Sequence, residues 1–120
     1  MKGIIILSHG SRQKSTENTL TSIVDMLKLA ITDYEIEYGF MEFSDKTIES
    51  GLDALREKGI KEIVAVPYFL FDGIHIREDI PEEIAKYVEK YPEVTISMGK
   101  TLGADPRLAE ILADRVREAL

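Results

Sequence analysis

Strand-like and helix-like segments alternate along the whole chain, and this alternation constrains the fold more than any other feature. Short runs rich in β-branched residues predict buried strands at residues 3–8, 34–40, 62–67 and 94–98. Helical periodicity follows each run and predicts helices over residues 15–31, 46–58 and 77–90, and a last helix with Asp105 as its N-cap. Such alternation is typical of an α/β fold, in which helices cover both faces of a parallel sheet.

The predicted sheet has four strands in the flavodoxin-like order 2-1-3-4, within a single domain that covers residues 1–120. Gly59 is predicted to end the second helix. The last helix carries an apolar stripe formed by Leu108, Ile111, Leu112 and Val116. Because so small a sheet leaves an outer strand exposed, we expect the chain to form an oligomer.

The composition excludes several classes of function. A net charge of −7 argues against a general nucleic-acid-binding protein and against binding to anionic membranes. Neither a signal segment nor an apolar run of membrane-spanning length is found, so we expect a cytoplasmic protein. The absence of cysteine excludes disulfides and thiolate metal sites.

The two histidines of the chain both lie near the ends of predicted strands. His9 directly follows the first strand, and His75 ends the loop after the third. Glu42 lies in the loop after the second strand, 33 residues from each histidine. The carboxyl ends of parallel strands form one edge of the sheet, where ligands bind. Two imidazoles and a carboxylate at that edge suit cobalt, nickel, iron or zinc, and imidazole also transfers protons near neutral pH.

Each of these polar residues also has an ordinary structural interpretation. A histidine at a strand end can simply bond to nearby backbone, and Glu42 can be a solvated loop acid. Asp45 can be the N-cap of the second helix. Arg12, Arg77 and Lys100 are unremarkable singly, but an anionic substrate at this edge would need such cations.

Large apolar side chains fill the loop after the third strand, where Asp72 and Gly73 indicate a turn. Such side chains either plug a core or hold a flat apolar ligand that has a polar rim. They are Tyr68, Phe69, Leu70, Phe71 and Ile74.

Four ordered motifs, spread over essentially the whole chain, resemble the small archaeal sirohydrochlorin chelatases of the class II chelatase family. The motifs are Ser8-His9-Gly10-Ser11-Arg12, then Met41-Glu42-Phe43-Ser44, then Val66-Pro67-Tyr68-Phe69-Leu70 with Gly73-Ile74-His75, and finally Leu102-Gly103-Ala104-Asp105-Pro106-Arg107. The resemblance implies a chelatase-like fold and a lyase that inserts a divalent metal into sirohydrochlorin without ATP. Cobalt is favoured and nickel is possible, in cobalamin or coenzyme F430 synthesis, and iron insertion for sirohaem is an alternative.

The resemblance also implies roles for particular residues. His9 corresponds to the catalytic base and a metal ligand, and His75 to the second metal ligand. The residues expected to contact the tetrapyrrole are Glu42, Asp45, Leu70, Phe71, Asp72, Gly73 and Ile74. Cobalt or nickel would be a substrate with no permanently bound cofactor, and the chain would form a homodimer or a dimer of dimers.

Two other classes of function compete with this one when the residues alone are considered, and the second of them is disfavoured. The same histidines would serve a non-catalytic carrier of metal or tetrapyrrole. A flavodoxin-like or receiver-like regulatory module is disfavoured, because Ser8, His9 and Gly10 stand where a receiver needs an acidic cluster. Histidine and carboxylate donors do not choose between cobalt and nickel.

Overall fold

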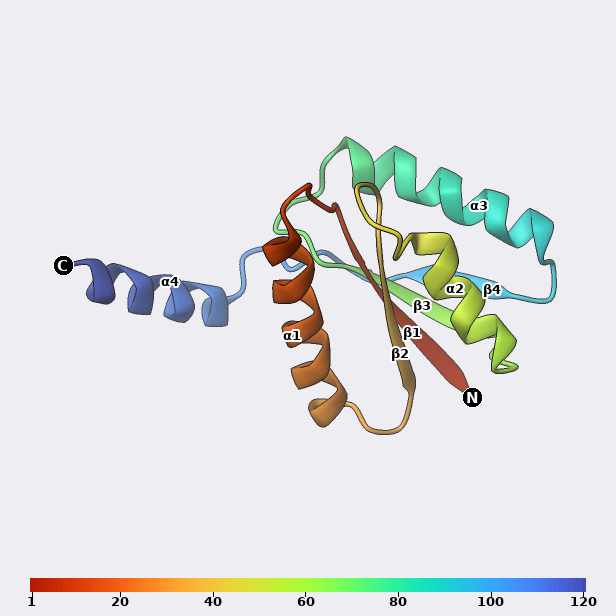
Figure 1. Cartoon of the computed structure of the whole chain (residues 1–120), viewed down its shortest axis with the longest axis horizontal. Helices are drawn as coiled ribbons and strands as arrows, with labels where there is room; N and C mark the ends of the chain where they lie inside the picture. The colour runs from red at the N-terminus through yellow and green to blue at the C-terminus, as the bar shows by residue number, and fades with distance from the viewer.

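The computed structural model describes residues 1–120, apart from the side chains of residues 75 and 76, and shows one parallel sheet with helices against both faces (Figure 1). Between β3 and α3 lies η1, a short π-helical turn. The elements in chain order are β1 (Lys2–Ser8), α1 (Lys14–Ala30), β2 (Glu35–Phe40), α2 (Ile48–Glu57), β3 (Glu62–Pro67), η1 (His75–Asp79), α3 (Ile80–Lys90), β4 (Thr95–Met98) and α4 (Pro106–Ala119). Among the described residues, none of these helices is long and apolar enough to cross a membrane.

The sheet has the strand order β2-β1-β3-β4, and all three pairings are parallel. Ile4 in β1 lies opposite Ile36 in β2 and Val64 in β3. The α/β fold class and the predicted order are therefore confirmed. Because successive side chains of a strand point to opposite faces, β1 supplies Ile5 and Leu7 to one face and Ile4 and Ile6 to the other.

The larger part of the core lies between the sheet and the pair α2 and α3 (Figure 1). Ile5 and Leu7 of β1 meet Leu52 and Leu55 of α2 and Ile80 of α3, and each is at most 1% exposed. Full burial of such a side chain stabilises the fold by about 1.5–3 kcal/mol. These two helices thus fix the sheet whose carboxyl edge carries the predicted site.

The opposite face of the sheet is covered by α1 over β1 and β2. Leu20 and Val24 of α1 are buried there against Ile6, Ile36 and Phe40. Beyond α1, the same face remains open over β1 and β3. A groove of about 350 Å³ lies there, lined by Lys2, Ile4, Ile6, Leu27, Ile31, Tyr34, Val64 and Val66.

The last helix, α4, extends away from the rest of the chain (Figure 1). The predicted helix and its cap are both confirmed, because the Asp105 side chain accepts a hydrogen bond from the Arg107 backbone N–H at 2.9 Å. The Arg107 guanidinium also donates to both carboxylate oxygens and holds the pKa of Asp105 well below its usual range. Yet no residue of α4 is buried, so its apolar stripe is not part of the core of this chain.

The structure also tests the residues that were predicted to begin and to end α2. Gly59 has φ +84°, and the bonds from Gly59 N–H to Arg56 O and from Ile60 N–H to Leu55 O end α2 in a Schellman motif, as predicted. At the other end of α2, the Thr47 side chain accepts from Ser50 N–H at 3.1 Å. Thr47 is therefore the N-cap, and the interpretation of Asp45 as the cap is wrong.

Candidate active site

The first and second strand-to-helix loops are held together by their backbones. Met41 N–H donates to Ser8 O at 2.9 Å, and Glu42 N–H donates to His9 O at 3.2 Å. The pairing of β1 with β2, which ends at Ser8 opposite Phe40, thus continues for two residues past the sheet edge. It sets His9 and Glu42 beside each other.

The side chains of His9 and Glu42 meet directly. His9 Nε2 lies 2.8 Å from Glu42 Oε1, and the two side chains are 46% and 47% exposed. The Phe69 ring, from the loop after β3, lies 6.5 Å from the imidazole centroid, inclined by 55°. A half-exposed imidazole that is oriented by a carboxylate and flanked by an aromatic ring can both bind a metal and move a proton.

Gly10 is the residue that lets the two loops approach so closely. Its φ is +96°, a region that side chains rarely adopt. A Cβ atom at this position would overlap the carbonyl oxygen of Glu42. Only glycine therefore fits between His9 and the second loop in this arrangement.

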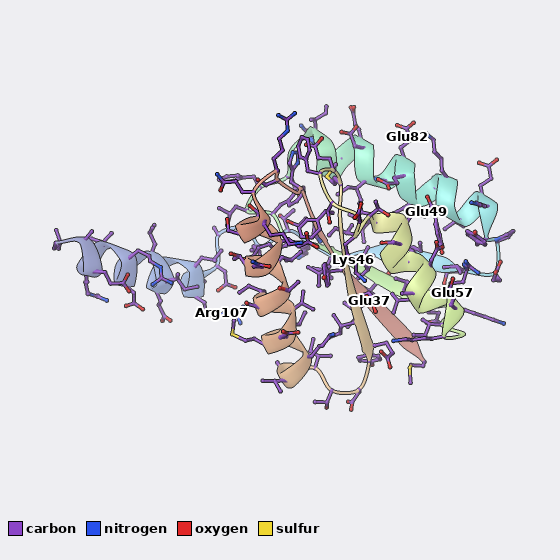
Figure 2. The ribbon with its side chains drawn as sticks, viewed as in Figure 1. Glu37, Lys46, Glu49, Glu57, Glu82 and Arg107 are labelled. Carbon is purple, nitrogen blue, oxygen red and sulfur yellow. The ribbon has the colours of Figure 1, made fainter. Side chains whose placement is uncertain are left out.

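The second loop is fixed at both ends. Lys46 N–H donates to Ser44 Oγ at 3.0 Å, and Lys46 Nζ lies 3.2 Å from Glu37 Oε1 of β2 (Figure 2). Phe43 has φ +62°, and the Arg12 guanidinium lies 5.0 Å above its ring. This contact ties the second loop to the residues that precede α1.

A polar cavity of about 380 Å³ lies between these two loops. Asp45 lines it, together with Arg12, Ser44 and residues of the first turn of α1. His9 and Glu42 are not among its lining residues. The structure therefore places Asp45 and the Arg12 cation in a compartment next to the His9–Glu42 pair, rather than in contact with it.

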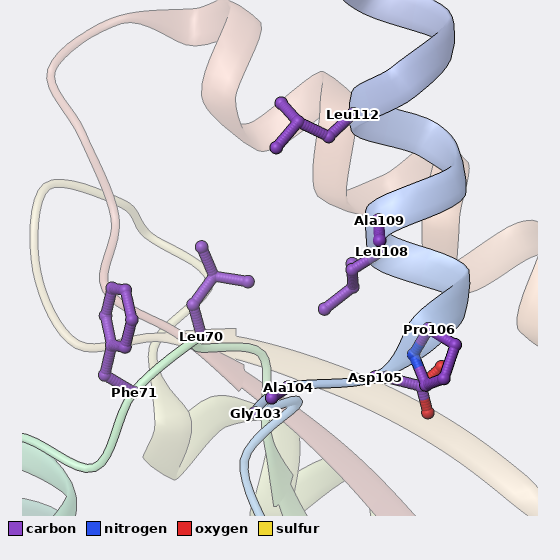
Figure 3. A pocket seen from close by; sticks show the side chains of 9 residues that line it. All are labelled: Leu70, Phe71, Gly103, Ala104, Asp105, Pro106, Leu108, Ala109 and Leu112. Atoms are coloured by element: carbon purple, nitrogen blue, oxygen red, sulfur yellow. The ribbon is translucent and has the colours of Figure 1, made fainter.

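The loop after β3 divides its apolar residues between two environments. Phe69 packs against the main core, as a plug would. Leu70 and Phe71 instead line an apolar cavity of about 540 Å³, where they face Leu108 and Leu112 of α4 (Figure 3). Phe71 is 77% exposed.

The remaining predicted residues of this loop do not join a cavity. Asp72, Gly73 and Ile74 are exposed, with no part in the lining of either the polar or the apolar cavity. The predicted metal ligand His75 lies outside the described residues. Arg77 and Lys100, the other two expected cations, are exposed.

The donors that could hold a metal can be counted only where side chains are described. Within that part of the chain, no group of three or more His, Cys, Asp and Glu side chains could hold a metal ion. The imidazole of His9 and the carboxylate of Glu42 are two described donors that meet at the sheet edge. They would hold a metal only with further ligands from the substrate, solvent or other residues.

The sequence indicated no role for Phe43, and it did not indicate that Gly10 lies against the backbone of the second loop. The positive φ of Phe43 has no signal in the sequence, because aromatic residues rarely adopt it. Gly10 follows a histidine at a strand end, and the sequence does not indicate what its missing side chain would touch.

Taken together, the fold and the site define an α/β protein with a histidine–carboxylate pair at the carboxyl edge of its sheet. A family model described as CbiX matches residues 3–119. The chain therefore belongs to the CbiX family.

Named relatives and a solved structure agree with this membership. The chain is 35% identical to the sirohydrochlorin ferrochelatase of Priestia megaterium, over 98% of this chain and 44% of that protein. It is 30% identical to the sirohydrochlorin cobaltochelatase of Methanopyrus kandleri, over 100% of this chain and 98% of that protein. The crystal structure of the sirohydrochlorin chelatase SirB from Bacillus subtilis subspecies spizizenii in complex with cobalt superposes with a TM-score of 0.91 at 32% identity, covering 98% of this chain and 50% of that one. The chain thus spans about half the length of the ferrochelatase and of SirB.

Proposed function

We propose that this chain is a chelatase that inserts a divalent metal into sirohydrochlorin, with cobalt as the preferred metal and nickel or iron as other substrates. The observation that carries the proposal is the contact between His9 Nε2 and Glu42 Oε1 at 2.8 Å, at the sheet edge where α/β proteins bind ligands. Support comes from relatives named sirohydrochlorin ferrochelatase and cobaltochelatase, and from a related structure in complex with cobalt. The reaction proceeds without ATP and leads toward cobalamin or coenzyme F430.

Metal insertion releases two pyrrole protons for each divalent ion that enters the ring, so the site must accept protons. A neutral imidazole has one donor and one acceptor nitrogen. The Glu42 carboxylate, 2.8 Å from Nε2, orients the His9 ring and stabilises its protonated form. His9 therefore presents the incoming metal to the ring nitrogens and takes up one pyrrole proton once the metal has left it, while the second pyrrole proton is released to solvent.

The surroundings of the pair suit the two kinds of surface on the substrate. Phe69 flanks the imidazole, and Leu70 and Phe71 line an apolar cavity. These side chains contact the face of the macrocycle, and Asp72, Gly73 and Ile74 contact its rim. The polar cavity receives the peripheral carboxylates of the substrate. Arg12 and the first turn of α1 bind these carboxylates there, and Asp45 lines the opposite side of the cavity.

The rest of the proposal concerns the whole protein. His75 is the second metal ligand, the metal passes through the site as a substrate, and no cofactor stays bound. Residues 1–120 act as one chelatase domain, and two chains form a homodimer, or two such dimers associate, in the cytoplasm.

The proposal is tested by anaerobic absorbance spectroscopy of sirohydrochlorin with catalytic amounts of protein and no nucleotide. Co²⁺, Ni²⁺ and Fe²⁺ are supplied separately, each against a protein-free control. We expect accelerated conversion over many turnovers, fastest with cobalt. A spectral change that stops at one equivalent per chain would contradict catalysis and indicate a carrier. No change above the control would refute any role in this reaction.

A further inference from the structure

The position of Phe43 in the second loop is not explained by packing. Its backbone has φ +62°, a conformation that is costly for an aromatic residue and that glycine adopts freely. Its side chain is nevertheless 52% exposed, so the strained backbone does not serve to bury the ring. Strain of this kind persists where the surrounding structure holds it, and it clusters at functional sites. The contact that the exposed ring makes is therefore the feature to explain.

The ring of Phe43 lies beneath the guanidinium of Arg12. The Arg12 Cζ atom is 5.0 Å from the ring centroid, which is within the range of a cation–π attraction. Among the side chains that the structure describes, Arg12 forms no ion pair. The face of a ring attracts a cation without accepting its N–H groups as a carboxylate does. The guanidinium thus keeps its fork of N–H donors for another group.

The charges around the polar cavity make the position of Arg12 decisive. The lining carries two cations and two carboxylates, so their combined field does not by itself attract an anion. Lys14 Nζ lies 3.8 Å from Glu17 Oε2, so one of the cations is already paired. Asp45 lines the same cavity and would compete for the Arg12 guanidinium if that side chain could turn freely. An anion in this cavity therefore depends on direct donation from Arg12, and so on where Arg12 is held.

The backbone on either side of Phe43 is fixed. Before it, Glu42 N–H donates to His9 O at 3.2 Å. After it, Lys46 N–H donates to Ser44 Oγ at 3.0 Å. The ring therefore stands on an anchored loop, whereas the long side chain above it would lose much rotamer freedom if it had to be ordered by a ligand alone.

We propose that Phe43 is a positioning residue, whose ring holds the Arg12 guanidinium at the polar cavity in place to bind a peripheral carboxylate of the tetrapyrrole. The inference rests on the proposed function, which supplies a substrate with such carboxylates. Phe43 acts through Arg12 and does not touch the reacting atoms. Its contribution is therefore to the affinity for the substrate and not to the rate of the chemical step.

The proposal is tested in the full chain with Phe43→Gly, which removes the ring and relieves the backbone strain. The Kd for sirohydrochlorin is measured by absorbance titration without metal, and KM and kcat are measured for cobalt insertion. We expect Kd and KM to rise by about 5-fold, the upper end for an exposed cation–π contact, and kcat to stay unchanged. The urea midpoint should not fall, because glycine adopts this φ freely. Loss of a residue that only packs would lower the midpoint.

Further variants show whether Phe43 acts through Arg12. Arg12→Ala alone should raise Kd by about 10-fold, the value of a charged hydrogen bond. In that background Phe43→Gly should change neither Kd nor KM, because the cation that the ring holds is already gone. Phe43→Tyr keeps an aromatic face and should retain the Kd of the wild type. The matched control is Tyr91→Leu, which removes a ring 3.9 Å from the Arg56 guanidinium, where α2 and α3 end, and should leave Kd unchanged.

Three outcomes would overturn the role of Phe43 while the proposed function stands, since the wild type would still bind sirohydrochlorin and insert cobalt. The first is a Kd for Phe43→Gly equal to that of the wild type. The second is the same rise in Kd with and without Arg12, which would mean that the ring only shapes the loop. The third is a fall in kcat at unchanged KM, which would mean that the ring acts on the His9–Glu42 pair. A wild type that does not bind sirohydrochlorin would refute the proposed function and this inference with it.

Discussion

Replacing Gly10 by alanine tests whether the first two loops are held as closely as the structure shows. Gly10 has φ +96°, and its added Cβ would overlap the Glu42 carbonyl oxygen. The second loop would have to move away from the first. Because Glu42 N–H donates to His9 O at 3.2 Å, this movement would also break the bond that aligns the two candidate catalytic side chains.

The expected cost follows from two contributions. A non-glycine residue in so sparsely populated a backbone region costs about 1–3 kcal/mol. Loss of the hydrogen bond between the loops adds about 0.5–1.5 kcal/mol. Gly10→Ala should therefore lower the free energy of unfolding by about 1.5–4.5 kcal/mol and separate His9 from Glu42.

Two other glycines provide controls for the backbone contribution alone. Gly59 and Gly103 also have positive φ, at +84° and +62°, but a Cβ at either meets nothing within 4 Å. Their alanine variants should lose only about 1–2 kcal/mol. Urea denaturation followed by circular dichroism measures all three. A loss for Gly10→Ala no greater than for Gly59→Ala would refute the close approach of the loops.

Three further predictions follow from other parts of the structure. Tyr87 O–H donates to Asp53 Oδ1 at 2.7 Å and accepts from Arg56 Nε at 3.1 Å, so Tyr87→Phe should lose about 1–2 kcal/mol in urea denaturation at neutral pH. Burial, helped by the bond to Asp53, raises the pKa of Tyr87 to about 12, so the stability it contributes is present below about pH 10 and is lost as the pH rises toward 12. Denaturation across that range should therefore show a shallower pH dependence for Tyr87→Phe than for the wild type, and equal slopes would contradict this. Thr47→Ala should lose about 1 kcal/mol of cap stability, whereas Asp45→Ala should leave thermal unfolding nearly unchanged.

The sequence predicted those features that local chemistry determines. The third strand was predicted at residues 62–67 and lies there, and the parallel four-stranded sheet follows from the alternation of strands and helices, whereas the handedness of the crossovers does not determine the strand order. Gly59 and Asp105 mark helix ends through side-chain and backbone chemistry that acts within a few residues. These signals need no knowledge of distant neighbours.

Other features depend on contacts between distant segments. Asp45 and Thr47 are both good N-cap residues, and the choice of Thr47 depends on a loop in which Phe40 N–H donates to Lys46 O. The sequence placed His9 and Glu42 at one edge, but it could not give their 2.8 Å contact, which depends on backbone pairing beyond the strands. It also indicated an apolar stripe on the last helix without indicating which surface the stripe would cover.

The most direct test of the proposed function is the turnover number for cobalt insertion by His9→Ala, measured beside the wild type and Glu57→Gln. Glu57 is exposed at the end of α2, away from the site (Figure 2), so its variant controls for a surface change. We predict that His9→Ala loses at least about 100-fold in turnover, the usual contribution of a positioned base, while its urea midpoint stays unchanged. Glu57→Gln should match the wild type. Near-normal turnover by His9→Ala would contradict the assignment of His9 as the residue that delivers the metal and accepts the proton.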